Sequence, residues 1–294
     1  ANSTVNLNQD VTIDQLNVSS GDTLNLNSGS DLSFVNGTTL TNNGNINLNG
    51  AGPLTRLNFS GASVIQGSGT ITLGNSSSNR INQAGAGAGI THGVNHTIRG
   101  AGNLLGNIGG LNNSGTIIAD QSTALVIDPG LAAVNNTGTL GAESGGTLTL
   151  GGGTFNNSGA GTISADGVGS VVNLSSSAVV VNGGTLSTTN FGQIRSAPGG
   201  ALLNGVATTA GTNILLNNND DIQLQNGFTN NGTINMNSVG NLTEMVVEGT
   251  QTLTGTGEIV MGQNGNNRVV VNADGTVVTL DANQTIRGAG QVLA

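Results

Sequence analysis

The sequence predicts an all-β fold, a right-handed parallel β-helix (β-solenoid) of about 13 coils of roughly 20–25 residues each. Three observations predict it: a short motif that recurs at a constant interval, short pieces that alternate polar and apolar residues, and corners rich in Gly and Asn. The 294 residues include 50 Gly, no Trp, Tyr or Cys, 35% apolar residues and only 7% charged residues. Unfolded chains are usually highly charged and poor in apolar residues, so this composition indicates a folded chain.

The recurring motif is Asn-x-Gly followed by Thr and one apolar residue. Its clearest copies begin at Asn113, Asn136, Asn157 and Asn182. The apolar residues that close these copies are Ile117, Leu140, Ile163 and Leu186, and they are evenly spaced (140 − 117 = 163 − 140 = 186 − 163 = 23). Because each closes the same motif, we expect these four side chains to stack as one interior row.

Alternating pieces such as 70–73 and 147–150 are typical of strands with one inward and one outward face. Gly and Asn at the corners reach the left-handed backbone conformations that sharp bends need. Three strands and three corners in about 22 residues make one coil of a solenoid. Leucine-rich repeats need a denser Leu pattern, and helical repeats need residues that form helices better than Gly and Asn. We also expect Asn at equivalent corners to form ladders of amide hydrogen bonds.

A longer duplication relates residues 41–105 to residues 229–293, at a constant offset (229 − 41 = 188). The segment Thr-Ile-Arg-Gly-Ala-Gly, for example, occurs at both 97–102 and 285–290. Added coils must stack without disturbing their neighbours, so we expect the offset to be close to a whole number of coils, about eight. We therefore treat residues 1–294 as one β-helix rod, and expect it to be an excerpt of a longer exported protein.

Apolar positions persist between the two copies, whereas charged positions change. The persistent pairs are Leu54 and Leu242, Leu57 and Met245, Phe59 and Val247, and Ile71 and Ile259. The changed pairs are Arg56 and Glu244, Ser60 and Glu248, and Thr70 and Glu258. We interpret the persistent positions as the interior and the changed positions as the surface.

The charge excludes several classes of partner. The formal net charge is −9 with only six Lys and Arg, so the chain has too few cations to neutralise nucleic-acid phosphates or to bind an anionic membrane surface. The absence of Cys removes disulfides, thiol chemistry and thiolate metal sites. No run approaches the roughly 20 apolar residues of a membrane helix, so we expect no membrane insertion of this segment.

Catalytic β-helices need acidic and basic groups clustered on one face, and the acidic residues here are scattered. Those considered are Asp10, Asp14, Asp22, Asp31, Asp120, Asp128, Asp166 and the adjacent pair Asp220 and Asp221. No calcium-binding repeat accompanies the pair. We expect all of them to be solvated corner residues, so the sequence assigns no catalytic residue and no enzymatic activity.

The remaining candidate ligands also favour structural roles. His92 and His96 correspond to Leu280 and Gln284 in the second copy, and a metal site would need a third ligand. The Gly-rich run at 85–89 is not followed by the Lys and Ser or Thr of a phosphate loop. We therefore expect no metal and no cofactor.

Two arginines recur in the duplication: Arg80 as Arg268, and Arg99 as Arg287. A recurrent Arg could bind an anionic sugar. We expect instead that each caps backbone carbonyls at a corner or pairs with a nearby carboxylate. The residues of any binding surface remain unassigned from the sequence.

The Asn-x-Gly-Thr-Ile coils and the Thr-Ile-Arg-Gly-Ala-Gly segment resemble the passenger and haemagglutinin-repeat regions of bacterial exported adhesins. These include autotransporter passengers and filamentous-haemagglutinin-like proteins. The resemblance covers the whole chain and implies a right-handed β-helix, export across the outer membrane, and an adhesive or self-associating function. The chain lacks both an aromatic-girdled barrel segment and the Asn-Pro-Asn-Gly secretion motif, so the secretion route stays open.

The expected function is that of an extracellular adhesive rod on the bacterial cell surface or secreted, which mediates cell adhesion, aggregation or biofilm formation. Its expected partners are a second copy of itself, or a host or matrix glycan or protein. The main alternative is a passive stalk that presents another domain. A glycan-processing enzyme would need long loops that form a cleft, and an ice-binding solenoid would need Thr-x-Thr in every coil. Thr-x-Thr occurs here only at 70–72, 147–149 and 252–254.

Overall fold

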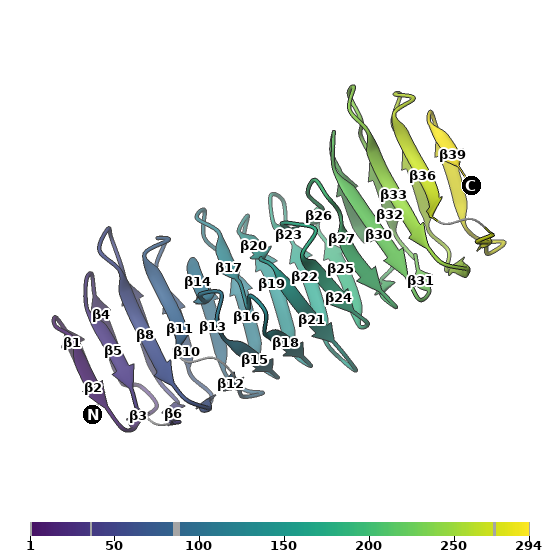
Figure 1. Cartoon of the computed structure of the whole chain (residues 1–294). Helices are drawn as coiled ribbons and strands as arrows, with labels where there is room; N and C mark the ends of the chain where they lie inside the picture. The colour runs from purple at the N-terminus through teal and green to yellow at the C-terminus, as the bar shows by residue number, and fades with distance from the viewer. Residues whose placement is uncertain (1, 36, 85–88, 273–274, 294) are drawn as a thin grey trace.

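The computed structural model describes residues 2–35, 37–84, 89–272 and 275–293, and these form an all-β solenoid without a helix. Accordingly, these ranges contain no helix that could span a membrane. Each strand pairs in parallel with the strands three positions earlier and later, which produces three 13-stranded sheets. The predicted fold class is confirmed. The coils stack along one axis, with the two ends of the chain at opposite ends of the stack (Figure 1). Residues 85–88 of the Gly-rich run lie outside the described ranges.

The three sheets, here called A, B and C, take one strand each from every coil. Sheet A contains β1 (Thr4–Leu7), β4 (Thr23–Asn27), β7 (Asn45–Asn49), β10 (Thr70–Leu73), β13 (Thr97–Gly100), β16 (Thr116–Ala119), β19 (Thr139–Glu143), β22 (Thr162–Asp166), β25 (Thr185–Thr189), β28 (Ala207–Thr208), β31 (Phe228–Thr229), β34 (Gln251–Thr254) and β37 (Val278–Leu280). Sheet B contains β2 (Val11–Ile13), β5 (Asp31–Phe34), β8 (Thr55–Ser60), β11 (Asn79–Ala84), β14 (Gly102–Leu105), β17 (Leu125–Ile127), β20 (Thr147–Leu150), β23 (Val171–Leu174), β26 (Gln193–Arg195), β29 (Asn213–Leu216), β32 (Thr233–Met236), β35 (Glu258–Met261) and β38 (Thr285–Gly288). Sheet C contains β3 (Leu16–Val18), β6 (Thr39–Asn42), β9 (Ser63–Gln66), β12 (Gly89–His92), β15 (Gly110–Asn113), β18 (Ala133–Asn136), β21 (Gly153–Asn157), β24 (Val179–Asn182), β27 (Ala201–Asn204), β30 (Asp221–Gln225), β33 (Thr243–Glu248), β36 (Asn267–Asn272) and β39 (Gln291–Leu293).

The core lies inside the three sheets and consists of rows of apolar side chains that stack from coil to coil. The predicted row is confirmed, because successive register pairs join Ile117, Leu140, Ile163 and Leu186. All four side chains are fully buried. Burial of each such side chain contributes roughly 1.5–3 kcal/mol.

Aromatic residues occupy the same interior. Phe34 and Phe59 lie on neighbouring strands of sheet B, with ring centroids 5.0 Å apart and planes 11° from parallel. Phe155 and Phe228 are also buried. The fifth, Phe191, is instead 85% exposed.

One pair of persistent apolar positions does not belong to the core. Leu242 is 40% exposed and Leu54 is only partly buried, so the prediction that this pair is interior is wrong. Both residues lie in a corner, immediately before a strand begins. The inward positions are taken by the next residues, Thr55 and Thr243, which are fully buried.

The duplicated segments do not lie on the same sheets, so the expectation of a whole number of coils is wrong. Strand β7 of sheet A matches β32 of sheet B, β8 of sheet B matches β33 of sheet C, and β9 of sheet C matches β34 of sheet A. The offset is 32 − 7 = 25 strands, or eight coils and one additional strand. All three sheets are built from similar strands and corners. A duplicated segment therefore needs to contain a whole number of strands with their corners, and it does not need to contain a whole number of coils.

Candidate functional site

The outer surface of sheet C carries a continuous ladder of asparagine side chains over six successive coils. We call it the outer ladder, and it consists of Asn112, Asn135, Asn156, Asn182, Asn204 and Asn226. Each Nδ2 donates a hydrogen bond to Oδ1 of the previous member, over distances of 2.7–2.9 Å. The strand register holds the members in line, as in the pairs of Asn135 with Asn112 and with Asn156.

The outer ladder retains unused hydrogen-bonding capacity. An Asn side chain has two N–H donors and an oxygen with two lone pairs. The ladder uses at most one N–H donor and one lone pair of each inner member. Spare donors and acceptors therefore recur at the spacing of neighbouring strands, about 4.8 Å.

Five members of the outer ladder lie on strands that form an electrically neutral face, whereas the sixth, Asn226, follows β30, which begins with Asp221. The sequences of the five strands are GLNN in β15, AVNN in β18, GTFNN in β21, VVVN in β24 and ALLN in β27. None contains a charged residue, although the chain has 21 Lys, Arg, Asp and Glu residues (6 + 15). Beside the Asn row lies a second outward row that includes Thr154, Val180 and Leu202, all partly exposed. We call this surface of β15, β18, β21, β24 and β27 the neutral face.

A second polar row lies inside the solenoid, at the corners from sheet C to sheet A. We call it the buried row, and it runs through Asn42, His96, His92, Asn113, Asn136 and Asn157. These six side chains are at most 1% exposed. The contacts between successive members are 2.6–3.0 Å long, so each buried polar group in the row has a partner.

The direction of the hydrogen bonds in the buried row fixes the state of both imidazoles. Asn42 Nδ2 can only donate, so His96 Nε2 accepts and His96 Nδ1 carries the proton. His96 Nδ1 then donates to His92 Nε2, and His92 Nδ1 donates to Asn113 Oδ1. The same direction continues from Asn113 to Asn136. The row is complete only while both rings are neutral.

Burial favours the same state. Desolvation lowers the pKa of His92 to about 4, although the hydrogen bond to Asn113 acts in the opposite direction. Desolvation, with a further contribution from His92, lowers the pKa of His96 to about 3. Both rings are therefore neutral at pH 7. Among the described residues, no group of three or more His, Asp or Glu side chains could hold a metal ion.

The glycines of the adjacent coil explain how the buried row spans two coils. His96 reaches Asn42 across the corner that contains Gly67 and Gly69. A Cβ atom at Gly67 would lie 2.1 Å from the carbonyl oxygen of Asn42, and one at Gly69 would lie 2.3 Å from that of Gly44. This corner thus approaches the preceding coil too closely for any side chain of its own, and His96 reaches past it to Asn42.

The second copy of the duplication builds the same contact without imidazole. Gln284 takes the place of His96: its Oε1 lies 3.3 Å from Asn230 Nδ2, and its Nε2 donates to the backbone oxygen of Asn230. Gly255 and Gly257 again leave the intervening corner free of side chains. The two copies therefore share a buried polar contact rather than a histidine site.

Asp221 lies beside Glu244 in the strand register, but the acidic residues of the described ranges form no group of three or more that could hold a metal ion. Asp220 and Asp221, the adjacent pair, lie in different environments. Asp220 is 7% exposed and its Oδ2 accepts from the backbone nitrogen of Asn217 at 2.8 Å, whereas Asp221 begins β30. The expectation of a solvated corner residue is wrong for Asp220, because its carboxylate closes the turn from Asn217. Burial raises the pKa of both carboxyls.

Three of the four recurrent arginines pair with carboxylates. Arg99 Nε donates to Asp120 at 2.7 Å, and Arg287 Nε donates to Glu258 at 2.8 Å. Arg268 lies 3.6 Å from Glu244.

Arg80 differs from the other recurrent arginines, because it forms no ion pair within the described ranges. Its register neighbours are Arg56 and Asn103, so no carboxylate is aligned with it. Arg80 also lies within β11 rather than at a corner, and its buried Nε has no hydrogen-bond partner in the described ranges. Both parts of the expectation, a carbonyl cap at a corner and an ion pair, are therefore wrong for Arg80.

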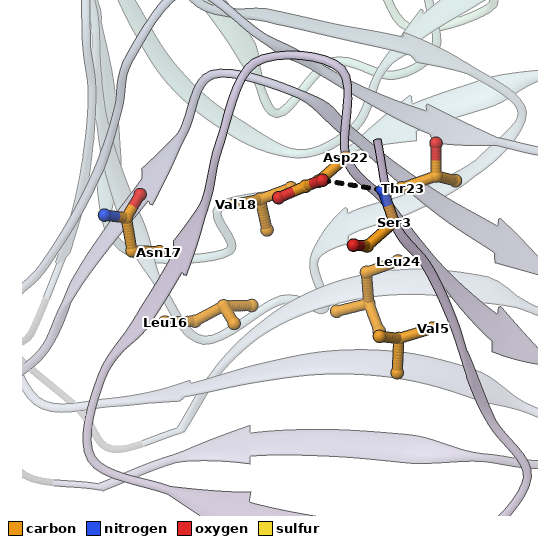
Figure 2. A pocket seen from close by; sticks show the side chains of 8 residues that line it. All are labelled: Ser3, Val5, Leu16, Asn17, Val18, Asp22, Thr23 and Leu24. Atoms are coloured by element: carbon orange, nitrogen blue, oxygen red, sulfur yellow. Dashed lines mark hydrogen bonds between the residues drawn. The ribbon is translucent and has the colours of Figure 1, made fainter. Parts of the chain in front are cut away.

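The first coils contain a hollow, which Figure 2 shows from close by. The backbone nitrogen of Ser3 donates to Asp22 Oδ1 at 2.8 Å beside it, and the apolar side chains of Val5, Leu16 and Leu24 line it. Sequence alternation places these apolar residues on the inward face of their strands. Leu16 and Leu24 pack against the core, whereas Val5 is 57% exposed, so the hollow is the open edge of the core and we assign no ligand to it.

The motif spacing did not identify the outer ladder, although the sequence contains a signal for it. Three strands of sheet C end in an Asn-Asn doublet, at 112–113, 135–136 and 156–157. Adjacent strand residues face opposite sides, so the first Asn of each doublet joins the outer ladder and the second joins the buried row.

No family model, curated protein or solved structure matches the chain. Its fold and its repeated surfaces define it as a parallel β-solenoid protein.

Proposed function

We propose that this chain is an extracellular adhesive rod of a bacterial surface or secreted protein, and that its neutral face associates with the neutral face of a second copy. The observation that carries the proposal is the outer ladder on a face without charge. The resemblance of the coils to exported bacterial adhesins supports the location and the adhesive role. In this proposal the chain acts without catalysis, metal or cofactor.

Two copies of the neutral face are matched to each other in period and in chemistry. Because both ladders repeat at the strand spacing of about 4.8 Å, spare donors of one copy can meet spare acceptors of the other over the whole face. A net hydrogen bond contributes only about 0.5–1.5 kcal/mol, but the first contact raises the effective concentration for the next. The partly exposed Val180 and Leu202 add apolar area.

The absence of charge on the neutral face makes the association possible in a chain of net charge −9. Like charges brought together across an interface oppose binding. Contact through the neutral face keeps the acidic residues of the two copies apart, and it should depend little on ionic strength.

Sedimentation of the purified chain over a range of concentrations tests this proposal. We expect reversible association in both low and high salt. Leu202→Lys places two like charges in the contact and should abolish association. Ser164→Lys is the matched control, because Ser164 is also partly exposed. It adds the same charge on the outer surface of sheet A, away from the neutral face, and should leave association intact.

A monomer at every concentration, or equal association of both variants, would overturn the proposal. The alternative is a passive stalk, and one observation favours it: the members of the outer ladder already satisfy one another in part. Adhesion by the full-length protein together with an inert rod would establish the stalk.

A further inference from the structure

The corner between β25 and β26 has an unusual backbone. It is a tight turn in which the nitrogen of Gly192 donates to the carbonyl oxygen of Thr189 at 2.9 Å. Its two central residues, Asn190 and Phe191, have positive φ values of 50° and 68°. Turns with two positive φ values strongly favour Asn followed by Gly, so Phe is an unfavourable residue at the second position.

The equivalent corners of neighbouring coils show what the fold itself requires here. Phe191 lies two residues before its sheet B strand. The residues at this position in the two preceding coils and the following coil are Gly145 (φ 80°), Gly169 (φ 79°) and Gly211 (φ 78°). Four successive coils thus need the left-handed conformation, and only this one places a bulky side chain there.

Burial does not explain the exception. Phe191 is 85% exposed, whereas the other four Phe side chains are at most 1% exposed. A strained backbone that carries an exposed aromatic ring indicates a role for the ring outside folding.

A surface hollow lies directly beside the ring. It is lined by Thr189, Asn190, Phe191, Gly211 and Asn213, among others. A Cβ atom at Gly211 would meet nothing within 4 Å, so this side of the hollow is open. The ring of Phe191 is the only large apolar side chain among the lining residues.

Two polar groups with spare capacity lie at the hollow: Asn213 lines it, and Asp166 bonds to the lining residues Thr189 and Asn190. Asp166, one coil earlier, accepts through Oδ1 from Thr189 Oγ1 at 2.6 Å and from Asn190 Nδ2 at 2.7 Å, which leaves Oδ2 without a partner among the described residues. These hydrogen bonds lower the pKa of Asp166, so its carboxylate is ionised at neutral pH. Asn213 uses its oxygen to accept from Asn235 at 2.8 Å, and its two N–H donors have no partner in the part of the chain that the structure describes.

We propose that this hollow binds one ring of a neutral glycan. The ring of Phe191 stacks on the C–H face of the sugar, while Asp166 accepts from its hydroxyls and Asn213 donates to them. Sites for such ligands combine an aromatic wall with a few polar groups that fix orientation. The carboxylate of Asp166 and the net charge of −9 disfavour acidic sugars. The proposal is independent of association through the neutral face, because Phe191 lies at the corner between sheets A and B.

Titration of the whole chain with neutral hexasaccharides of glucose, mannose and N-acetylglucosamine, followed by nuclear magnetic resonance, tests the proposal. Oligogalacturonate serves as the acidic comparison. We expect at least one neutral hexasaccharide to shift signals of residues around the hollow. Phe191→Gly should weaken binding about tenfold or more, since an aromatic contact is worth roughly one factor of ten.

The same variant separates binding from folding. Phe191→Gly installs the residue of the flanking corners, so its melting temperature should equal or exceed that of the parent chain. Phe191→Trp should keep the binding, and Val168→Ser, which removes another exposed apolar side chain one coil earlier, should leave it unchanged. Leu202→Lys should also leave glycan binding unchanged. A failure of the glycan-site proposal can therefore be distinguished from a failure of the proposed rod association.

Three results would overturn the proposal: no neutral hexasaccharide binds, only oligogalacturonate binds, or Phe191→Gly binds as well as the parent chain. A lower melting temperature for Phe191→Gly would also overturn it, because the ring would then have a structural role.

Discussion

Nε2 of His96 lies 3.0 Å from Nδ2 of Asn42, a residue 54 positions earlier and two coils away. The contact closes one end of the buried row, and it makes the stability of the interior depend on the protonation of an imidazole. Protonated His96 would bring an N–H donor against another N–H donor.

The free energy of unfolding should fall as the pH is lowered from about 6.5 towards 4. His92 and His96 have pKa values of about 4 and about 3 in the folded chain, below the ordinary value of 6.5. In this range the unfolded chain binds more protons than the folded chain, so stability is fully present above pH 6.5 and is lost at lower pH. One ring with a pKa near 4 corresponds to about 3 kcal/mol. Thermal unfolding monitored by circular dichroism across this range measures the effect.

His96→Gln is the matched control for this pH dependence. The second copy already uses Gln284 at this position, so the variant should fold. A Gln side chain can accept from Asn42 and donate to His92 without titrating. Its pH dependence should therefore be about half that of the parent chain. Identical pH profiles for the two chains would contradict the neutral-imidazole assignment.

Replacing Ile163 with Asp should cost several kcal/mol. The side chain is fully buried between Leu140 and Leu186, and an unpaired carboxylate there cannot be solvated. Asp166→Asn, three residues later, should change stability by less than about 0.5 kcal/mol, because Asp166 is exposed and an amide oxygen can accept the same two hydrogen bonds. Chemical denaturation compares the two. Equal tolerance would mean that the strand register is wrong.

Asn136→Ala should destabilise the chain far more than Asn135→Ala, although the two residues are adjacent. Asn136 is fully buried and bonds both Asn113 and Asn157, so its loss leaves the buried Oδ1 of Asn157 unpaired, at about 1–3 kcal/mol, and removes one hydrogen bond of Asn113. Asn135 belongs to the exposed outer ladder, where water replaces the lost bonds. Melting temperatures of the two variants measure the difference, and similar values would refute the distinction between the two rows.

Gly69→Ala should be strongly destabilising and Gly265→Ala close to neutral. Neither glycine has a positive φ, so the comparison isolates steric contact. A Cβ atom at Gly69 would lie 2.3 Å from the carbonyl oxygen of Gly44, in the corner that the buried row crosses, whereas one at Gly265 would meet nothing within 4 Å. Thermal unfolding of both variants provides the measurement. A stable Gly69→Ala variant would show that this corner is not tightly packed.

The row of Ile117, Leu140, Ile163 and Leu186 could be predicted because the constant spacing of the motif and a strand period of two leave one register. The sheet shift of the duplication could not be predicted, because coil length varies. The step from Thr97 to Thr116 (116 − 97 = 19) is much shorter than the step from Thr70 to Thr97 (97 − 70 = 27). Because coil length varies this much, the offset of 188 residues is compatible with eight coils and also with eight and one-third coils.

The hollow beside Phe191 escaped prediction for a different reason. In the sequence, Phe191 is one apolar residue among many, and its exposure depends on the sign of φ at a single corner. The positive φ of Phe191 is recognised only in the structure, where the equivalent corners of the neighbouring coils have Gly at this position. Likewise, the outer ladder and the buried row use the same residue type, and only the strand faces separate them.

The one-strand shift between the duplicated segments has a consequence for the directions in which the rod can act. A pattern that faces one side in the first copy faces a side one-third of a turn away in the second. A rod that lengthened by whole coils would present every repeated surface along a single line. This chain presents the same pattern in two directions around its axis, so contacts made through the pattern need not lie in one plane. Rods joined through both copies would branch into a mesh.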